Sequence, residues 1–545
     1  MRELAPLDVL RLYPSHGNTL WGLAKSRAHA HPTRTFLYFD GRELGWRDFC
    51  RRVEKARWLL RRLGVARGDR VGIMAPNSAD YVVVMFAVAA AGAITLPISP
   101  ALTVPEATYI IGHAKPVLIF CTAETKVVAR AAAGQAAVAP AMITMGREFG
   151  DRLASVDDGA RPGKMSNPRA GADTPPTAGE RGSAADDTAL ILYTSGTTGL
   201  PKGVMHSQAS MIMTGELFVE RMGLQPTDRL LCVLPFYHIN ALLYSLMGAM
   251  AAGASLVLTP RFSASGFWKL AAASGATEAN IIATVGRILC KRPRSEFVPS
   301  HRITKVYGAP IPADVYKTFR EDFHIATLVE GYGLSEAPGL SSNPFRGPQK
   351  IGSIGVPTRH PDPARPYAEM KIVDEAGRAA PAGTVGELYV ATPAMMQGYY
   401  LDPDATAASF QGKWFRTGDI AVRERDGFYR FVARKKDIIR RRGENISGAE
   451  IDDVISQHPE VQVAASVAVA SDMGEDEILV AVTPRPGSLL TERSLHDWCV
   501  DKLNSIKVPR YIVFVDSLPY TPSHRVAKYR LRADESLRKR AVKFS

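Results

Sequence analysis

Apolar and polar positions change their spacing along the first part of the chain, from helical to strand periods and back. Residues 46–65, WRDFCRRVEKARWLLRRLGV, carry apolar side chains at helical spacing with basic residues between them. The segment RVGIMAPNS, from Arg70, then has the pattern of a buried strand that runs into a turn. This alternation over residues 20–125 predicts stacked β-α units around a largely parallel sheet.

A long uncharged run begins at Tyr81 and reads YVVVMFAVAAAGAITLPISPALTV. It is long enough for a membrane-spanning helix, but AAGA and LPISP interrupt it in the middle. We therefore expect a buried helix, a turn and a buried strand, and no stable membrane insertion. The start of the chain, MRELAPLDVLRLYPSHGNTL, lacks the apolar segment of a secretory signal peptide. These features predict a cytoplasmic protein.

Residues 150–187 contain almost no large apolar side chains, so they cannot bury enough surface to fix their backbone. We expect a flexible insert there. Helix and strand patterns resume at Thr188 and continue to about residue 360. Short strands separated by turns follow over residues 366–432, and a basic run from Ala433 marks a boundary before a small α+β region.

The composition agrees with a soluble globular protein of more than one domain. The chain has 545 residues, of which 46% are hydrophobic and 22% are charged, and it is too long for one ordinary core. The predicted fold class is α/β, with a large N-terminal domain over residues 1–433 that contains stacked α/β subdomains and a small β subdomain. A small α+β domain over residues 434–545 follows.

The net charge of +13 favours anionic ligands but does not separate a nucleotide or CoA from nucleic acid or a membrane surface. The basic run has no interleaved aromatic residues, and we expect no nucleic-acid partner. The cysteines are scattered and form no Cys-x-x-Cys pair, which predicts reduced thiols in the cytoplasm. They are Cys50, Cys121, Cys232, Cys290 and Cys499.

The segment YTSGTTGLPKG, from Tyr193 to Gly203, is the first that carries chemistry. An apolar strand pattern precedes it, and we expect a helix after it. Glycines let backbone amides approach a phosphate, hydroxyl groups donate hydrogen bonds, and Lys202 supplies positive charge. The segment is not a Walker A loop, because no Gly-Lys-[Ser/Thr] closes it. It therefore predicts a phosphate-binding loop of another kind.

This segment resembles the phosphate-binding loop of the adenylate-forming superfamily, which includes acyl-CoA synthetases, luciferases and peptide-synthetase adenylation domains. Further segments resemble the motifs of that family in the same order, and the resemblance covers roughly residues 18–535. They are PFYHINA (235–241), YGAPI (307–311), GYGLSE (331–336), WFRTGDI (414–420) and ARKKDIIRRRGENISGAEID (433–452). The resemblance implies that the C-terminal domain is mobile and rotates between two half-reactions.

The resemblance also implies the reaction. A carboxylic acid is activated as acyl-AMP with release of pyrophosphate, and the thiol of coenzyme A then takes the acyl group. ATP, Mg²⁺ and coenzyme A are the expected cofactors. The residues expected to bind ATP or AMP are Thr194, Ser195, Gly196, Thr197, Thr198, Gly199, Lys202, Gly308, Ala309, Pro310, Tyr332, Gly333, Ser335, Asp419 and Arg434.

Particular roles follow from the matching positions. Tyr332 is expected to stack on adenine, while Asp419 and Arg434 are expected to contact the ribose. Glu336, a hard oxygen ligand, and Thr197 are the expected Mg²⁺ ligands. His238 lies near the expected acyl and thiol path, where we expect a positioning or gating role.

The basic segment supplies the expected hinge and CoA contacts. Lys436 stands at the hinge position, and Gly443 resembles the glycine that lines the pantetheine tunnel. Glu444, Arg442 and the neighbouring arginines from Arg440 are expected near coenzyme A.

The acid itself is only partly constrained. Amino-acid-activating members place an aspartate where RFSASGFW (261–268) has Ser263, and a buried ammonium needs such a counter-charge, so an α-amino acid is disfavoured. Together with RRRGENIS, this segment is most similar to the carnitine/crotonobetaine-CoA ligase-like branch. NIIATVG (280–286) and APGLSSNPF (337–345) are expected to shape the acyl pocket.

One motif departs from the family. The family pattern Thr-Pro-[Ser/Thr]-Gly-Lys carries the lysine that contacts the carboxylate and the α-phosphate, and here His524 and Arg525 replace Gly-Lys. Arginine is a planar fork and lysine a compact charge, so the geometry differs. Either Arg525 substitutes directly, or Lys528 reaches in, or the protein is a degenerate fold that binds nucleotide or acyl-CoA without full turnover. We favour Arg525. A ligase that loads a carrier protein instead of CoA is a further alternative.

Overall fold

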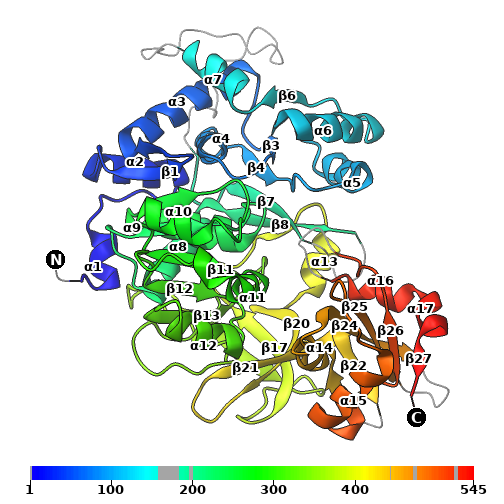
Figure 1. The fold of residues 1–545 in the computed structure, drawn as a ribbon. Coiled ribbons are helices and arrows are strands. Elements are labelled where there is room, and N and C mark those ends of the chain that lie inside the picture. Colours follow the sequence, from blue (N-terminus) through cyan, green and yellow to red (C-terminus); the bar gives the residue numbers. More distant parts are fainter. Residues whose placement is uncertain are drawn as a thin grey trace. The chain divides into compact units, whose positions relative to one another are not determined.

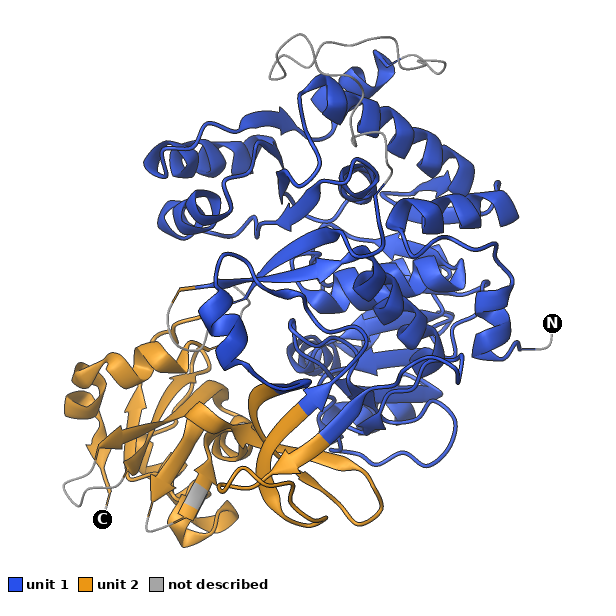
Figure 2. Ribbon diagram, turned by 180° about the vertical axis from the view of Figure 1, so that it is seen from behind, with its two compact units in different colours: residues 1–194, 201–370, 390–415 blue, residues 195–200, 371–389, 416–545 orange. Residues whose placement is uncertain are grey.

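The computed structural model describes residues 3–156, 183–194, 200–441, 444–470, 476–520 and 526–544, without the side chain of Asn445. The chain forms two units (Figure 2). Unit 1 contains residues 1–194, 201–370 and 390–415, and unit 2 contains residues 195–200, 371–389 and 416–545. The predicted domain boundary after residue 433 stays a prediction. Within the described residues, no helix combines the length and apolar character that crossing a membrane requires.

The first sheet of unit 1 is parallel from β1 to β13 and antiparallel at its edges (Figure 1). Its strands are short apolar runs, which is typical of strands covered on both faces. In spatial order they are β15 (Val356–Pro357), β14 (Ser341–Ser342), β13 (Thr327–Tyr332), β12 (Lys305–Gly308), β11 (Glu278–Ile281), β9 (Arg229–Cys232), β10 (Ser255–Leu258), β1 (Thr35–Phe39) and β2 (Arg42–Gly45).

The second sheet of unit 1 is parallel from β7 to β6, and β8 and β18 extend it with antiparallel pairs. In spatial order its strands are β18 (Gly398–Tyr399), β8 (Lys202–Ser207), β7 (Thr188–Thr194), β4 (Ile94–Pro97), β3 (Arg70–Met74), β5 (Leu118–Cys121) and β6 (Ala141–Thr144). The β-α units predicted around one largely parallel sheet are confirmed from β3 to β5, whereas β1 and β2, which come from the same region of the sequence, belong to the first sheet.

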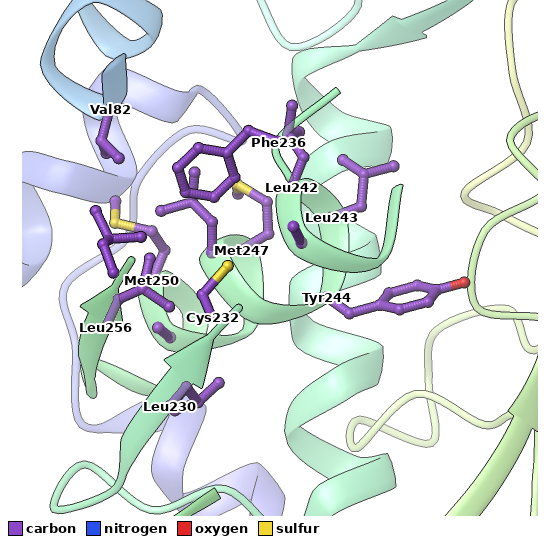
Figure 3. Packing of buried hydrophobic residues seen from close by; sticks show 14 of the residues in the cluster. Val82, Leu230, Cys232, Phe236, Leu242, Leu243, Tyr244, Met247, Met250 and Leu256 are labelled. Atoms are coloured by element: carbon purple, nitrogen blue, oxygen red, sulfur yellow. The ribbon is translucent and has the colours of Figure 1, made fainter. Parts of the chain in front are cut away.

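A helical layer packs against both sheets of unit 1. Its members are α2 (Leu20–Ala30), α3 (Trp46–Arg62), α4 (Ala79–Ala90), α8 (Gln208–Met222), the π-helix η1 (Asn240–Leu246) and α9 (Met247–Ala252). Figure 3 shows the apolar side chains of η1, α9, β9 and β10 that meet in this layer. The uncharged run from Tyr81 divides between α4 and β4, as predicted.

Unit 1 contains further helices. They are α1 (Pro6–Arg11), α5 (Val104–Ala114), α6 (Ala123–Gln135), α7 (Arg147–Ala154), α10 (Phe267–Ser274), α11 (Ala283–Lys291), η2 (Arg294–Glu296), α12 (Ala313–Glu321) and α13 (Pro403–Ala408). Helix α7 corrects the start of the predicted flexible insert, because it continues to Ala154 whereas the insert was expected to begin at residue 150. Phe149 and Leu153 are one turn apart and buried, and Phe149 packs edge-on against Phe120 at 5.5 Å, so these residues do form a helix.

The short strands predicted for residues 366–432 lie partly in unit 1 and partly in unit 2, and unit 2 also contains the α+β region after them. The division between the units passes through β16 (Glu369–Val373), β17 (Val385–Ala391) and β20 (Trp414–Arg423), which pair in one sheet with β19 (Phe410–Gln411) and β21 (Tyr429–Arg434). The C-terminal elements are η3 (Lys435–Asp437), β22 (Ile438–Arg441), β23 (Glu444–Ser447), α14 (Gly448–Ser456), β24 (Val461–Ala470), β25 (Asp476–Pro484), α15 (Glu492–Lys502), η4 (Ser505–Lys507), β26 (Tyr511–Phe514), α16 (Lys528–Ala533), α17 (Glu535–Arg540) and β27 (Val542–Lys543).

Candidate active site

The predicted phosphate-binding loop lies between two paired strands of unit 1. Thr194, the last residue of β7, pairs with Lys202, the first residue of β8. The prediction of a helix directly after the loop is therefore wrong. Residues 202–207 form a strand that pairs with β7, and helix α8 begins only at Gln208. The other predicted members of the loop, Ser195, Gly196, Thr197, Thr198 and Gly199, lie outside the described residues.

Tyr399 joins two of the predicted motifs. Its hydroxyl group donates to Glu336 Oε1 at 2.9 Å, and the ammonium of Lys202 lies 4.9 Å from the centroid of its ring. Burial and the adjacent Glu336 carboxylate raise the pKa of Tyr399, so the phenol keeps the proton that it donates. The main-chain carbonyl of Glu336 also accepts from the amide of Met396 at 2.8 Å. The carboxylate is thereby fixed in direction.

A buried histidine contacts the backbone of the GYGLSE segment. His206 on β8 is fully buried, and its Nε2 lies 2.7 Å from the carbonyl oxygen of Ser335. Because a carbonyl only accepts, Nε2 carries the hydrogen. Burial lowers the pKa of His206 to about 4, so the ring is neutral at neutral pH. Its Nδ1 lies 3.3 Å from Ser210 Oγ.

The expected adenine-binding segments lie at neighbouring strand ends. Strands β12 and β13 are parallel, with Gly308 opposite Glu330, so YGAPI and GYGLSE leave the same edge of the sheet. This is the edge where ligands bind in open α/β sheets. A Cβ atom at Gly308 would lie 2.4 Å from Ile311 Cγ1, so a larger residue does not fit there. Ala309 and Pro310 follow directly, and Tyr332 is the last residue of β13.

His238 lies just before helix η1. Its amide donates to the carbonyl of Pro235 at 3.1 Å, and its carbonyl accepts from Leu242 at 3.1 Å. The imidazole packs on the ring of Tyr237, with centroids 4.6 Å apart. The backbone thus holds this half-exposed ring at the start of the helix, and its positioning role stays a prediction.

In unit 2, the two residues expected at the ribose form a pair. Asp419 on β20 is directly opposite Arg434 on β21, and Arg434 Nε lies 2.8 Å from Asp419 Oδ1. Asp419 is fully buried, and its amide donates to Thr417 Oγ1 at 3.0 Å. The guanidinium therefore compensates a buried carboxylate and fixes its orientation.

The expected hinge residue Lys436 is held by a residue that the sequence did not single out. Arg532 on α16 donates from Nη1 to the carbonyl of Lys436 and from Nη2 to Asp437 Oδ1, the latter at 2.8 Å. Burial lowers the pKa of Lys436, and Asp437 partly opposes that shift. The backbone of the hinge is thereby tied to the C-terminal helices of the same unit.

The two candidates for the catalytic cation differ in what the structure shows of them. Arg525 lies outside the described residues. Lys528 is the first residue of α16, and its ammonium lies 2.6 Å from Asp452 Oδ2, with side-chain exposures of 16% and 19%. Lys528 is therefore engaged in a nearly buried ion pair within unit 2.

The expected CoA contacts are divided in the same way. Arg442 and Gly443 lie outside the described residues, while Glu444 is exposed at the start of β23. The structure corrects the expectation that Arg441 lies near coenzyme A. Arg441 is buried, pairs with Glu477 at 2.8 Å and donates to the carbonyls of Ile506 and Val508. Arg440 remains exposed.

The donor set at Glu336 fits Mg²⁺. In the described part of the chain, Oε2 of Glu336 has no hydrogen-bond partner, whereas Oε1 is bonded to Tyr399. Among the residues that the structure describes, no group of three or more His, Cys, Asp and Glu side chains could hold a metal ion. One protein carboxylate completed by phosphate oxygens is how Mg²⁺ commonly binds.

Two family descriptions match the chain in succession. The one described as AMP-binding enzyme matches residues 24–400, and the one described as AMP-binding enzyme C-terminal domain matches residues 450–525. The chain therefore belongs to the AMP-binding enzyme family.

Curated relatives resemble it over nearly their whole lengths. A sulfoacetate–CoA ligase of Cupriavidus necator is 31% identical over 86% of this chain and 88% of that protein. An oxalate–CoA ligase of Arabidopsis thaliana is 31% identical over 94% and 97%, and a feruloyl-CoA synthase of an Amycolatopsis species is 30% identical over 93% and 97%.

Solved structures show the same fold. ATP-bound MatB from Rhodopseudomonas palustris aligns with a TM-score of 0.80 at 24% identity, over 95% of this chain and 98% of that one. The anthranilate CoA ligase AuaEII, in complex with anthranoyl-AMP, aligns with a TM-score of 0.81 at 23% identity, over 97% and 98%. The fold class predicted from the sequence is confirmed.

Proposed function

We propose that the protein is an ATP-dependent acyl-CoA ligase, which forms an acyl-AMP from a small carboxylic acid and transfers the acyl group to coenzyme A. The observation that carries this proposal is the contact of Tyr399 with both Lys202 and Glu336. Through this contact, the lysine of the phosphate-binding segment and the carboxylate of the GYGLSE segment both lie against the phenol of Tyr399. The relatives named as CoA ligases support CoA as the acceptor.

In the first half-reaction, a carboxylate oxygen of the acid attacks the α-phosphorus of ATP, and the bond to pyrophosphate breaks. Lys202 and the donors of the phosphate-binding segment orient the triphosphate, while Tyr332 stacks on adenine and Asp419 with Arg434 hold the ribose. Glu336, fixed by Tyr399, would hold Mg²⁺, which neutralises charge on the phosphates when it is bound. Arg525 supplies the cation that bridges the carboxylate and the α-phosphate.

In the second half-reaction, the sulfur of CoA attacks the acyl carbon, and the bond between that carbon and the AMP oxygen breaks. The thiol proton passes to solvent, and AMP leaves with the oxygen of the acid. Lys436 provides the hinge between the half-reactions, and Gly443, Glu444 and Arg442 contact CoA. The predicted compartment is the cytoplasm.

Pyrophosphate release and acyl-CoA formation, measured together on one panel of acids, test this proposal. We expect release that depends on acid, ATP and Mg²⁺, and a CoA thioester detected by mass spectrometry. Glu336→Gln should abolish most of both signals, whereas Glu321→Gln, at a carboxylate of α12 that is 61% exposed, should change neither. Release without any CoA thioester would favour a carrier-protein acceptor, and bound ATP without release would favour a degenerate fold.

A further inference from the structure

The ring of His113 on helix α5 lies at the base of the phosphate-binding segment. Its Nδ1 lies 2.5 Å from the hydroxyl oxygen of Tyr193 on β7, the residue directly before Thr194. Burial raises the pKa of Tyr193, so the phenol keeps a hydrogen to donate to Nδ1. The segment is therefore bonded to a helix that belongs to none of the sequence motifs.

Three tyrosine rings contact the imidazole of His113. Tyr109, one turn earlier on α5, stacks on it with the ring centroids 5.7 Å apart. Tyr193 and Tyr400 each meet it edge-on, with centroids 5.8 Å away. We call His113, Tyr109, Tyr193 and Tyr400 the His113 cluster. Stacked and edge-on contacts between rings are favourable, so these three neighbours fix the orientation of the imidazole.

The His113 cluster contacts both strands that carry the phosphate-binding segment. Tyr193 on β7 pairs with Gly203 on β8, and the next pair is Thr194 with Lys202, where β7 ends and β8 begins. The amide of Tyr400 donates to the carbonyl of Gly203 at 2.7 Å. A Cβ atom at Gly203 would lie 3.3 Å from Tyr193 Cζ and 3.2 Å from Tyr400 Cβ. Both tyrosines therefore lie against the backbone next to Lys202.

Tyr400 also connects the His113 cluster to the expected Mg²⁺ ligand. It follows Tyr399, whose hydroxyl donates to Glu336 Oε1 and whose ring lies 4.9 Å from the ammonium of Lys202. Strand β18, which ends at Tyr399, pairs with β8, which begins at Lys202. One side chain of α5 therefore contacts the residue directly before Thr194 and the residue directly after Tyr399.

We infer that His113 is a positioning residue for ATP, which acts through Tyr193 and Tyr400 and holds Lys202 in place relative to Glu336. This inference rests on the proposed function, in which Lys202 orients the triphosphate and Glu336 holds its Mg²⁺. The attraction between a lysine and a phosphate falls as their separation grows. A displaced Lys202 therefore weakens ATP binding, whereas the binding of the acid does not depend on it.

Removal of the hydrogen bond from either side tests the inference on the full-length protein. His113→Phe keeps an aromatic ring beside Tyr109 and Tyr400 but removes the acceptor, and Tyr193→Phe removes the donor. Each should raise KM for ATP, and the calorimetric dissociation constant of ATP with Mg²⁺, by about five- to tenfold, as expected for one lost hydrogen bond. KM for the acid should not change. The double variant should lose no more than either single variant, because both remove the same bond.

A conservative variant and a matched control complete the set. His113→Asn provides an amide oxygen that can accept from Tyr193, so it should restore most of the ATP affinity that His113→Phe loses. Tyr109→Phe removes a hydroxyl group from the same cluster and leaves the bond between His113 and Tyr193 in place. It should change neither KM for ATP nor the dissociation constant.

The two constants for ATP separate a failure of the inference from a failure of the proposed function. Acyl-CoA formation with a lower kcat but an unchanged KM for ATP in both single variants, or additive losses in the double variant, would overturn the inference while the ligase function stands. In a protein that forms no acyl-CoA, weaker ATP binding by both variants supports the inference although the proposed function fails, and unchanged binding overturns it. A wild-type protein that binds no ATP overturns both.

Discussion

Tyr399 occupies the centre of the candidate site in unit 1. It donates to the carboxylate of Glu336 and lies beside the ammonium of Lys202, so one phenol fixes the direction of an anion and a cation. Hydrogen bonds from a neighbouring group commonly tune a metal ligand, and their loss weakens metal binding without removing the ligand. The side chain therefore matters for Mg²⁺ even though it is not an expected ligand.

Tyr399→Phe should raise the Mg²⁺ concentration needed for half-maximal pyrophosphate release by about ten- to a hundredfold. The physical reason is that Glu336 loses the hydrogen bond at Oε1 and can rotate. A magnesium titration of the variant at saturating ATP measures the shift. Tyr367→Phe, at an exposed tyrosine of the same unit, is the matched control, and an unchanged magnesium dependence in Tyr399→Phe would contradict the role assigned to Tyr399.

The ion pair between Lys528 and Asp452 separates the two candidates for the catalytic cation. Arg525→Ala should lower acid-dependent exchange between ATP and pyrophosphate by about 10²–10³-fold at unchanged melting temperature, as expected for one lost transition-state contact. Lys528→Ala leaves the buried Asp452 without its partner and should cost about 3 kcal/mol of stability. Exchange assays and thermal melts of both variants measure this, with Arg530→Ala on the exposed side of α16 as control. The opposite ranking in exchange would assign the role to Lys528.

At the scale of elements, β8 carries both a predicted and an unpredicted part of the site. Lys202 begins the strand, and His206 lies near its end with its ring against the GYGLSE segment. The neutral ring contributes stability through burial and the bond to Ser335. This contribution depends on pH, because the folded pKa of about 4 lies below the ordinary value of 6.5.

Because the pKa of His206 is lowered on folding, its contribution is fully present above about pH 6.5 and is lost as the pH falls toward 4. The full loss amounts to about 3 kcal/mol. His206→Gln keeps a donor for Ser335 but cannot titrate, so its free energy of unfolding should change less between pH 7 and pH 4.5. Urea unfolding at several pH values measures the difference, and His29→Gln, at an exposed histidine, should keep the wild-type slope. Parallel slopes for the wild type and His206→Gln would contradict this assignment.

Element types followed from local patterns wherever the pattern was strong. Helix α3 and the α4–β4 pair were predicted because their apolar positions repeat at helical or strand spacing over many residues. Helix α7 was missed because its buried face consists of only Phe149 and Leu153, next to a long polar stretch. Strand β8 was mistaken for a helix because its pairing with β7 depends on a segment before the loop.

The residues of the candidate site also differ in whether a local motif predicted them. Glu336, Lys202, Asp419 and Arg434 were predicted from motifs, but Tyr399 and Arg532 were not. Tyr399 contacts Glu336 from a segment 63 positions away, and Arg532 reaches Lys436 across 96 positions. No local period or spacing encodes such contacts, since they depend on how the sheets bring separate segments together.

At the scale of the whole molecule, the chain consists of two units, and the hinge segment lies within unit 2. If the half-reactions use different conformations at Lys436, a restriction there should affect them unequally. Lys436→Pro fixes one backbone angle and disfavours the helical conformation of Lys435. We expect it to lower CoA thioester formation at least tenfold more than acid-dependent ATP–pyrophosphate exchange.

Lys435→Ala is the matched control for the hinge, because it removes the ion pair between the exposed Lys435 and Glu387 and leaves the backbone free. It should change neither half-reaction by more than about twofold, because Lys435 is at the exposed end of the pair and the backbone at Lys436 is unchanged. Equal losses of exchange and thioester formation in Lys436→Pro would contradict a hinge role. Separate single-turnover measurements of each half-reaction give the comparison.

Transfer of oxygen from the acid to AMP tests the adenylate-forming ligase function most directly. The protein is incubated with ATP, Mg²⁺, CoA and an acid whose carboxylate carries heavy oxygen, using oxalate, sulfoacetate and acetate in turn. If the acid attacks the α-phosphorus, mass spectrometry should find the label in AMP, with unlabelled pyrophosphate and an acyl-CoA of the same acid. Label in inorganic phosphate with formation of ADP, or acyl-CoA without labelled AMP, would contradict an acyl-AMP intermediate and with it the function proposed for this protein.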